Sequence, residues 1–428
     1  MKRLVWLSVT AAVALAGLVA CSKKEEAPAA AGPAQGTEAR SELLVRGQYL
    51  TAAGDCYACH TVRGGEPYAG GLEMATPFGA LYTPNITPDK ETGIGNWTAS
   101  DFWGAMHDGK SKDGSFLYPA MPYTNYTKVT REDSDAIYAY IMSVKPVKRA
   151  NQPHALNFPF NQRQLMLGWR TLYFKAGVFK ESPEKSKEWN RGAYLVEGLG
   201  HCNACHAARN MLGAVSADDD YSGGLIPVQN WYAPSLTSGS ESSLSVWETR
   251  EIVDLLRTGV SQRAAVFGPM AAVVKHSLQE LSMTDLTAMA TYLKEQAEKP
   301  SSEPWLAHER SKAEVATMMA TGAKVYEEHC ASCHMPDGSG VPRAYPPMAN
   351  NHAITMRNPV NLIRMVLNGG FPPSTEGNPR PYGMPPFYPI LNDSQIAAVV
   401  TYIRQSWGNK ASPTWAMEVS RSRGLPAD

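Results

Sequence analysis

Apolar residues recur at helical spacing in three parts of the chain, and the predicted elements follow the same order each time. A first helix contains a glycine followed by an aromatic residue, a second ends at a glycine, and a third carries a tyrosine. The first helices include 46–50, 191–195 and 321–326; the second span 97–109, 247–259 and 359–369; the third span 134–143, 284–294 and 393–406. The pattern predicts a mainly α protein built from three repeats. A glycine in each first helix would allow close approach where the first and last helices cross; that it merely marks a helix start is the alternative, and its recurrence favours the crossing.

The first forty residues follow a different pattern. Lys2 and Arg3 precede an apolar stretch over 4–18, and a small residue, Ala20, comes just before Cys21. This order predicts a secretory signal peptide over 1–20. The residues at 18–21 are also similar to a bacterial lipobox, which would lipidate Cys21; cleavage after Ala20 with a free thiol is the alternative. The Lys-, Glu-, Ala-, Pro- and Gly-rich residues at 21–40 predict a flexible tether.

Six of the seven cysteines lie in three copies of Cys-x-x-Cys-His, at 56–60, 202–206 and 330–334. Two thiols at this spacing can form thioethers with the two vinyl groups of one porphyrin, and the adjacent histidine can then bind the iron. The motifs therefore predict three covalently bound haem c groups. The predicted attachment residues are Cys56, Cys59, Cys202, Cys205, Cys330 and Cys333, and the predicted proximal ligands are His60, His206 and His334.

Other functions of a Cys-x-x-Cys pair explain these copies less well. Structural zinc needs four ligands, so each pair would have to find further ligands elsewhere and its histidine would have no role. A thioredoxin-like pair expects a βαβ context, which is absent from these segments. A disulfide within each pair gives no reason for a histidine in all three copies.

A methionine stands in a Pro- or Gly-rich loop between the second and third helix of each repeat. Met121, Met270 and Met384 follow the three motif histidines by 61, 64 and 50 residues. A thioether is a soft iron ligand, and proline stiffens the loop that aims it. We therefore expect these methionines as the distal ligands, although most of the 18 methionines are expected to fill the core. The competing histidines are His107, His276 and His352.

The net charge limits the kind of partner, and the positions of the repeats give the domain boundaries. Removing Lys2 and Arg3 with the signal peptide leaves 40 − 2 = 38 basic residues against 40 acidic ones, so the formal charge is near −2 and no nucleic-acid partner is expected. The repeats predict domains over 41–150, 189–300 and 310–410. The apolar segment 151–188 is expected to pack between the first two domains, with docking of a dehydrogenase or quinone as the alternative, and 411–428 reads as a polar tail.

Longer stretches around the motifs resemble a known family over nearly the whole mature length. The order of elements is similar to that of class I cytochrome c domains, and the chain resembles the three-haem cytochrome c subunit of bacterial membrane-bound periplasmic dehydrogenases that oxidise alcohols, aldehydes or gluconate. The stretches that carry this resemblance lie at 70–72, 76–79, 83–89, 93–97, 117–123 and 189–202. Those subunits often carry a C-terminal amphipathic helix, whereas here the chain ends in polar residues.

The resemblance implies an electron-transfer subunit with no catalytic site of its own. A large quinoprotein or flavoprotein subunit would oxidise the substrate, and the haems would pass electrons to membrane quinone, a terminal oxidase or another acceptor. The protein would sit on the periplasmic side of a bacterial membrane, held by a lipid on Cys21. The alternatives are a free-standing periplasmic shuttle and a multihaem enzyme of the peroxidase or thiosulfate-oxidising type.

Overall fold

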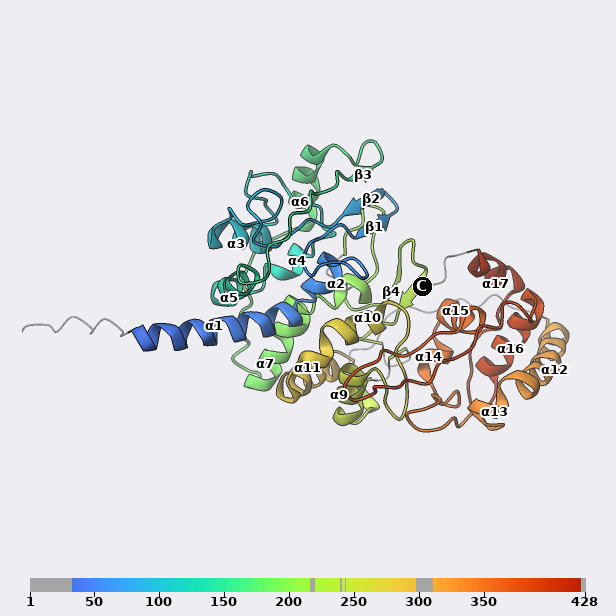
Figure 1. Cartoon of the computed structure of the whole chain (residues 1–428). Helices are drawn as coiled ribbons and strands as arrows, with labels where there is room; N and C mark the ends of the chain where they lie inside the picture. The colour runs from blue at the N-terminus through green and yellow to red at the C-terminus, as the bar shows by residue number, and fades with distance from the viewer. Residues whose placement is uncertain (1–32, 216–219, 239–240, 243, 298–310, 425–428) are drawn as a thin grey trace, which may run out of the picture. The chain divides into compact units, whose positions relative to one another are not determined.

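The structure is a computed structural model (Figure 1), and it describes residues 33–215, 220–238, 241–242, 244–297 and 311–424. The predicted signal peptide, Cys21 and most of the predicted tether lie outside the described residues. Residues 42–428 form one compact unit, distinct from residues 1–41. In the part of the chain that is described, no helix is both long and apolar enough to cross a membrane.

The three predicted helices are present in every repeat. The first repeat contains α1 (Pro33–Ala53), α2 (Cys56–His60), α3 (Ala99–Asp108), α4 (Tyr123–Tyr126) and α5 (Arg131–Ile141). The second contains α7 (Lys187–Tyr194), α8 (Asn203–His206), α9 (Thr249–Thr258), α10 (Pro269–His276) and α11 (Met283–Gln296). The third contains α12 (Lys312–His329), α13 (Ala331–His334), α14 (His352–Thr355), α15 (Val360–Asn368) and α16 (Asp393–Gln405). The prediction of a mainly α chain is confirmed.

Each repeat brings its first and last long helices into contact at a glycine. A Cβ atom built on Gly47 would lie 2.0 Å from the carbonyl oxygen of Ala136 in α5. The same atom on Gly192 would lie 2.0 Å from the Ala288 oxygen in α11, and on Gly322 it would lie 2.3 Å from the oxygen of Ala398 in α16. Any side chain would force the helices apart, so these glycines permit the crossing and do not merely mark helix starts.

The second repeat holds one extra residue between its crossing glycine and its motif. Gly47 precedes Cys56 by nine residues, whereas Gly192 precedes Cys202 by ten. The continuation of α7 over Leu195–Leu199 (η2) is a π-helical turn. A π-turn contains one more residue than an α-turn, so it absorbs the insertion without ending the helix.

Short antiparallel strands follow the motifs in the first two repeats. β1 (Glu73–Thr76) pairs with β2 (Gly79–Tyr82), and β4 (Gly224–Ile226) pairs with β5 (Trp231–Ala233). A third short strand, β3 (Ala155–Leu156), adds to the edge of β2. The hydrophobic pattern did not predict these strands, because each holds only two to four residues.

The first and second repeats share one hydrophobic core, whereas the third has its own. Leu50, Ile137 and Tyr126 of the first repeat belong to the same buried cluster as Leu195 and Met289 of the second. The core of the third repeat is a separate cluster. It contains Tyr326, Leu362, Ile363, Leu367, Val399, Val400 and Ile403.

Reciprocal polar contacts hold the first two repeats together. Tyr49 of the first donates to Asp285 of the second at 2.6 Å, and Tyr194 of the second donates to Asp133 of the first, also at 2.6 Å. Each aspartate also accepts from an arginine of its own repeat, Arg46 on Asp133 and Arg191 on Asp285, both at 2.9 Å from Nε. Each repeat thus makes the same contact to the other, as in an interface between two subunits related by a two-fold axis.

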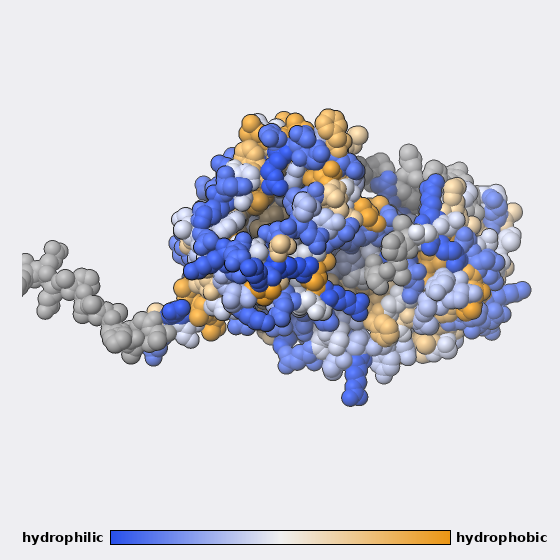
Figure 2. All heavy atoms as spheres, turned by 45° about the horizontal axis from the view of Figure 1, so that its top comes forward, coloured by the Kyte–Doolittle hydropathy of each residue, from blue (hydrophilic) through white to orange (hydrophobic). Residues whose placement is uncertain are grey.

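The segment between these repeats does not bury its apolar residues as expected. It contains a 3₁₀ turn over Arg163–Leu165 (η1) and the helix α6 (Met166–Tyr173). Phe158, Leu165, Leu167 and Leu172 are 80%, 56%, 59% and 71% exposed, so the prediction that they pack between the domains is wrong. Figure 2 shows apolar side chains gathered at the top of the view, over β3 and α6. Inward from this surface, the Arg170 guanidinium stacks on the rings of Phe116, Tyr123 and Phe174.

Both ends of the predicted domain array contain more helix than expected. α1 begins at Pro33, so the last residues of the predicted tether are helical. The predicted polar tail includes α17 (Ala416–Arg423), whose Val419 is fully buried in the core of the third repeat. Arg423 also donates to Asp393 of α16 at 2.7 Å, and these contacts fix the polar segment to the repeat.

Candidate haem sites

The three motif histidines make the same contact in all three repeats. The Nδ1 atom of His60 lies 2.8 Å from the carbonyl oxygen of Pro84, that of His206 lies 2.7 Å from Pro234, and that of His334 lies 3.1 Å from Pro346. A carbonyl oxygen can only accept, so Nδ1 carries the proton and Nε2 is left as the ring nitrogen with a lone pair. This arrangement orients an imidazole for metal binding through Nε2.

The protonation state of these histidines also suits iron ligation. Burial lowers the pKa of His60, His206 and His334 below the usual value, although the bonds to the proline carbonyls oppose that change. The three imidazoles are therefore neutral at pH 7, and a neutral imidazole is the form that binds a metal.

Backbone pairing between short segments just before each proline positions its carbonyl group. Pro84 and Pro234 follow closely after the ends of β2 and β5, the returning strands of the two hairpins. In the third repeat, an isolated antiparallel bridge between Val341 and Tyr345 comes directly before Pro346. Three different lengths of loop thus deliver the same acceptor to the same ring nitrogen.

The six motif cysteines form no disulfides with one another. Four of them, together with the histidine that follows each pair, lie on the short helices α2, α8 and α13. Burial raises the pKa of the Cys56, Cys202 and Cys330 thiols to about 12. A thioredoxin-like pair depends on a lowered thiol pKa, so these environments disfavour that alternative. Thiols available for thioethers and a free Nε2 on each histidine fit a covalent haem.

The predicted distal methionines occupy corresponding loops in different local structures. Met121 lies in a bend before α4 and packs against the shared core. Met270 is the second residue of α10 and packs on the same core, so it stands at a helix start and not within a loop. Met384 pairs with Gly370 through two backbone hydrogen bonds of 2.8 and 3.0 Å and packs against the core of the third repeat. Their binding to iron stays a prediction.

Two competing histidines have other contacts. His107 stacks on Trp103, with ring centroids 4.5 Å apart, and its Nδ1 lies 2.9 Å from Asp108. His276 lies at the end of α10, where its ring is 5.1 Å from that of Tyr57, inside the first motif. The second contact links α10 of the second repeat to α2, the helix of the first motif.

The attachment motifs of the first and second repeats lie close together. Burial, the charge of Asp55 and then the thiol of Cys205 raise the pKa of Cys59 to about 11. Tyr126 donates to the Gly54 carbonyl at 2.7 Å, and its ring packs edge-on against His201, one residue before the second motif. The shared interface therefore brings these two candidate haem sites next to each other.

Sequence reasoning missed the residues that orient the histidines and join the repeats. The proline carbonyls are main-chain groups, so the only signal was a proline in the loop that follows each motif. The Arg-Gly-x-Tyr pattern at 46–49 and 191–194 was visible, but its pairing with an aspartate of the other repeat depends on how the repeats pack.

Comparisons with known proteins agree with this architecture. The cytochrome c family model matches residues 44–145 and 319–407. The gluconate 2-dehydrogenase cytochrome c subunit of Pantoea cypripedii is 42% identical over 389 residues, which cover 88% of each chain. The chain belongs to the family of cytochrome c subunits of bacterial dehydrogenases.

Two further relatives differ in how much of the chain they match. The cytochrome c subunit of alcohol dehydrogenase (quinone) from Gluconacetobacter polyoxogenes is 40% identical over 407 residues, 92% of this cytochrome c subunit and 87% of the relative. A diheme cytochrome c-type protein of Cereibacter sphaeroides is 37% identical over 255 residues, which cover 58% of this chain and 84% of the relative. The similarity to the longer relatives extends over nearly the whole chain.

Proposed function

We propose that the protein is a three-haem cytochrome that relays electrons from the catalytic subunit of a dehydrogenase. The observation that carries this proposal is the histidine whose Nδ1 is held by a proline carbonyl beside two free thiols, found three times. Bound haem would supply an iron that accepts and releases one electron at a time. The three repeats would be tandem class I cytochrome c domains, each enclosing one haem.

Within this relay, the first two haems would form a closely spaced pair. Support comes from the contact of Tyr57 with His276 and from Tyr126, which is bonded to the Gly54 carbonyl and packs against His201. The proposed ligand pairs are His60 with Met121, His206 with Met270, and His334 with Met384.

Haem quantitation tests the number and ligation of the haems. The purified full chain should contain three covalent haems, all low-spin, with the weak far-red charge-transfer band of methionine-ligated ferric haem. Met121→Ala, Met270→Ala and Met384→Ala should each remove about a third of that band. The control is Met211→Ala, because this side chain is 94% exposed. Two haems per chain, or a high-spin haem with peroxide turnover in the unaltered protein, would contradict the proposal.

The electron donor would be a large subunit with a quinone or flavin cofactor, and the acceptor would be membrane quinone or another respiratory acceptor. Support for the donor comes from relatives that are named as subunits of gluconate and alcohol dehydrogenases. Co-purification of a cofactor-bearing subunit that reduces the haems when its substrate is added would test this part. A chain that purifies alone and exchanges electrons only with soluble partners would instead be a free-standing shuttle.

Attachment to the membrane through Cys21 is a separate part of the proposal. It rests on the apolar stretch at 4–18 and the lipobox-like residues at 18–21. Several acyl chains on one cysteine would hold the protein at a membrane surface on the periplasmic side. Cys21→Ser should move the haem protein from the membrane fraction to the soluble fraction. Equal membrane retention of the variant would contradict a lipid anchor at this residue.

A further inference from the structure

The face that joins the first and second repeats has a counterpart in the third. Alignment on the crossing glycines places Thr321 at the position of the two arginines and Lys324 at that of the two tyrosines. Alignment on the crossing alanines places Gln395 at the position of Asp133 and Asp285. The N-cap of the last helix is also shared, since Thr130, Ser282 and Asn392 each accept from the backbone three residues on. The scaffold is thus retained, while all three pairing side chains are replaced.

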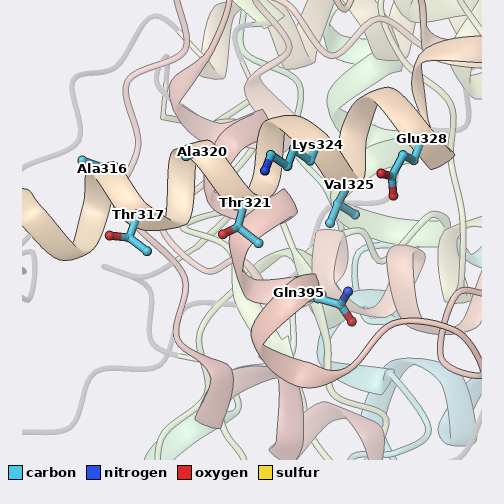
Figure 3. Close-up of a pocket in the computed structure, with 8 residues that line it drawn as sticks. All are labelled: Ala316, Thr317, Ala320, Thr321, Lys324, Val325, Glu328 and Gln395. Carbon is cyan, nitrogen blue, oxygen red and sulfur yellow. The ribbon is translucent and has the colours of Figure 1, made fainter.

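In the third repeat this face is an open groove of about 710 Å³ between α12 and the start of α16. It is lined by Ala316, Thr317, Ala320, Thr321, Lys324, Val325, Glu328 and Gln395. Figure 3 shows Thr321, Val325 and Glu328 pointing from α12 toward the side on which Gln395 lies. The corresponding face of the second repeat is closed, with Tyr194 only 6% exposed. The ring of Phe387 lies 6.1 Å from that of His329, the last residue of α12, so residues 388–390 follow beside the end of the groove at which Glu328 lies. We call the groove and residues 388–390 the α12 face.

The apolar residues beside the groove are more exposed than the residues at the matching positions of the first repeat. Tyr126 of the first repeat is 5% exposed, whereas Tyr388, at the matching position four residues before the N-cap, is 54% exposed. Ile390 is 60% exposed and matches Lys128, which pairs with Glu197 of the second repeat. Exposed large apolar side chains beside a groove mark an interaction surface.

The loop that carries these side chains is held in place. Arg423 of α17 donates to the carbonyl oxygens of Tyr388 and Leu391 at 2.9 and 3.0 Å. Its Nε atom also donates to Asp393 at 2.7 Å. The loop is therefore presented in one conformation, which lowers the cost of ordering it on binding.

A second copy of this chain is a poor occupant for the α12 face. The first two repeats meet near the ends of their first helices, where Gly54 lies against Leu199 and Ala53 is buried. Glu328 is exposed at the position of Ala53, and Glu327 beside it is also exposed. The same two-fold arrangement between two copies would bring these carboxylates together, and like charges at an interface are repulsive. Neither copy would supply the tyrosine, aspartate and arginine that hold the first and second repeats together.

We propose that the catalytic subunit of the dehydrogenase docks on the α12 face. This inference rests on the proposed function, because it assumes such a partner. The partner would place small or apolar side chains in the groove, against Tyr388 and Ile390, and a basic group near Glu327 and Glu328. Because Glu328 stands two residues before Cys330, the partner's cofactor would face the third haem, as the first two attachment motifs face each other.

Four single variants of the full haem-loaded chain test the surface. Ala320→Arg fills the groove, and its control is Val45→Arg, at the matching exposed position of α1. Ile390→Lys places a charge beside the groove, and its control is Leu167→Lys on α6, since the two side chains are 60% and 59% exposed. The probe is the cofactor-bearing subunit that co-purifies with the unaltered chain, and affinity and the rate of substrate-driven haem reduction are measured.

We expect Ala320→Arg and Ile390→Lys to weaken binding at least about tenfold, and both controls to stay within about twofold of the unaltered chain. Haem content and the far-red band confirm folding of each variant. Unchanged binding by both test variants, or loss of binding in Leu167→Lys alone, overturns the docking site. Concentration-dependent dimers of the unaltered chain that Ala320→Arg disrupts, with partner binding intact, also overturn it in favour of a second copy. If no cofactor-bearing subunit co-purifies at all, the proposed function itself has failed.

Discussion

The first two repeats and the third use one helical scaffold in two ways. In the first two, a tyrosine of each repeat reaches an aspartate of the other, and their apolar residues merge into one core. In the third, threonine, lysine and glutamine occupy the pairing positions, the core is separate, and the matching face is open. The comparison shows that one helical scaffold with the same crossing glycines can have this face covered by another repeat or left open, and that the two cases differ at three pairing positions.

The largest expected effect is the loss of a crossing glycine. Gly192→Ala would place a methyl group 2.0 Å from the Ala288 carbonyl oxygen, and we expect a loss of about 3 kcal/mol or more in the free energy of unfolding. Because the core is shared, the first and second haem environments should be disturbed together. Gly322→Ala should disturb only the third. Denaturant unfolding followed by haem absorbance measures both.

The control for the glycine variants is Gly168→Ala in α6. A methyl group there would meet no atom within 4 Å, so the free energy of unfolding should change little. If Gly192→Ala left the first haem environment intact while altering the second, the first two repeats would not be one cooperative unit.

The aspartate between repeats is expected to matter next. Asp133→Ala removes the acceptor of Arg46 and Tyr194, and its side chain is only 4% exposed. We expect a loss of about 2 kcal/mol in the free energy of unfolding, since charge-assisted hydrogen bonds are removed and a buried tyrosine hydroxyl loses a partner. Gln395→Ala, at the matching position of the third repeat, removes only the bond that this side chain accepts from the Asn392 backbone N–H, and it should cost less, about 0.5 to 1 kcal/mol. Equal losses would erase the distinction between the repeats.

Acid should weaken the contacts between the first and second repeats before it affects the third repeat. Burial acts to raise the pKa of Asp285, but hydrogen bonds from Arg191 and Tyr49 outweigh it and lower the pKa below the usual value. The resulting stability is complete above about pH 4, the ordinary pKa of an aspartate, and is lost as the pH falls through the folded-state pKa. Unfolding measured against pH should show this loss, on the order of 1.5 kcal/mol, for the first two repeats. Asp285→Asn should flatten that part of the profile.

A smaller effect is expected from one tyrosine hydroxyl. Tyr126→Phe removes a 2.7 Å hydrogen bond to the buried Gly54 carbonyl, which should cost about 1 kcal/mol of unfolding free energy. Tyr388→Phe removes a hydroxyl from a residue that is 54% exposed, and the expected change is near zero. Thermal unfolding of the two variants side by side gives the difference. A larger loss for Tyr388→Phe would show that the third repeat is supported through this face.

Much of the repeat architecture could be predicted, because it depends on patterns of residues that are close together in the sequence. The helical spacing of apolar residues located all nine long helices of the three repeats within the described residues, and the recurring glycine indicated where they cross. The Cys-x-x-Cys-His motifs coincide with the short helices α2, α8 and α13, while haem attachment and iron ligation by their residues stay predictions. The methionines remain predictions, since ligation depends on an iron that the side chains must reach.

Features that depend on packing between distant segments could not be predicted. The reciprocal contacts of Tyr49 and Tyr194 join residues more than 60 positions apart. The sequence around each tyrosine does not identify the aspartate that it contacts. The apolar residues of α6 looked like core residues in the sequence, but hydrophobicity does not say whether a neighbour covers them. The same limit applies to Val419, a single apolar residue in a polar tail that the core of the third repeat covers.

The acceptors that orient the three histidines are carbonyl oxygens of the main chain. Every residue has a main-chain carbonyl group, whatever its side chain. A point mutation at the proline therefore cannot remove the oxygen that accepts from the histidine Nδ1–H; it can only move that oxygen. The orientation of each histidine ring therefore depends less on the side chain at the acceptor position than it would if a side chain were the acceptor. The three repeats show this within one chain, because loops of different length bring a proline carbonyl to the same ring nitrogen of each histidine.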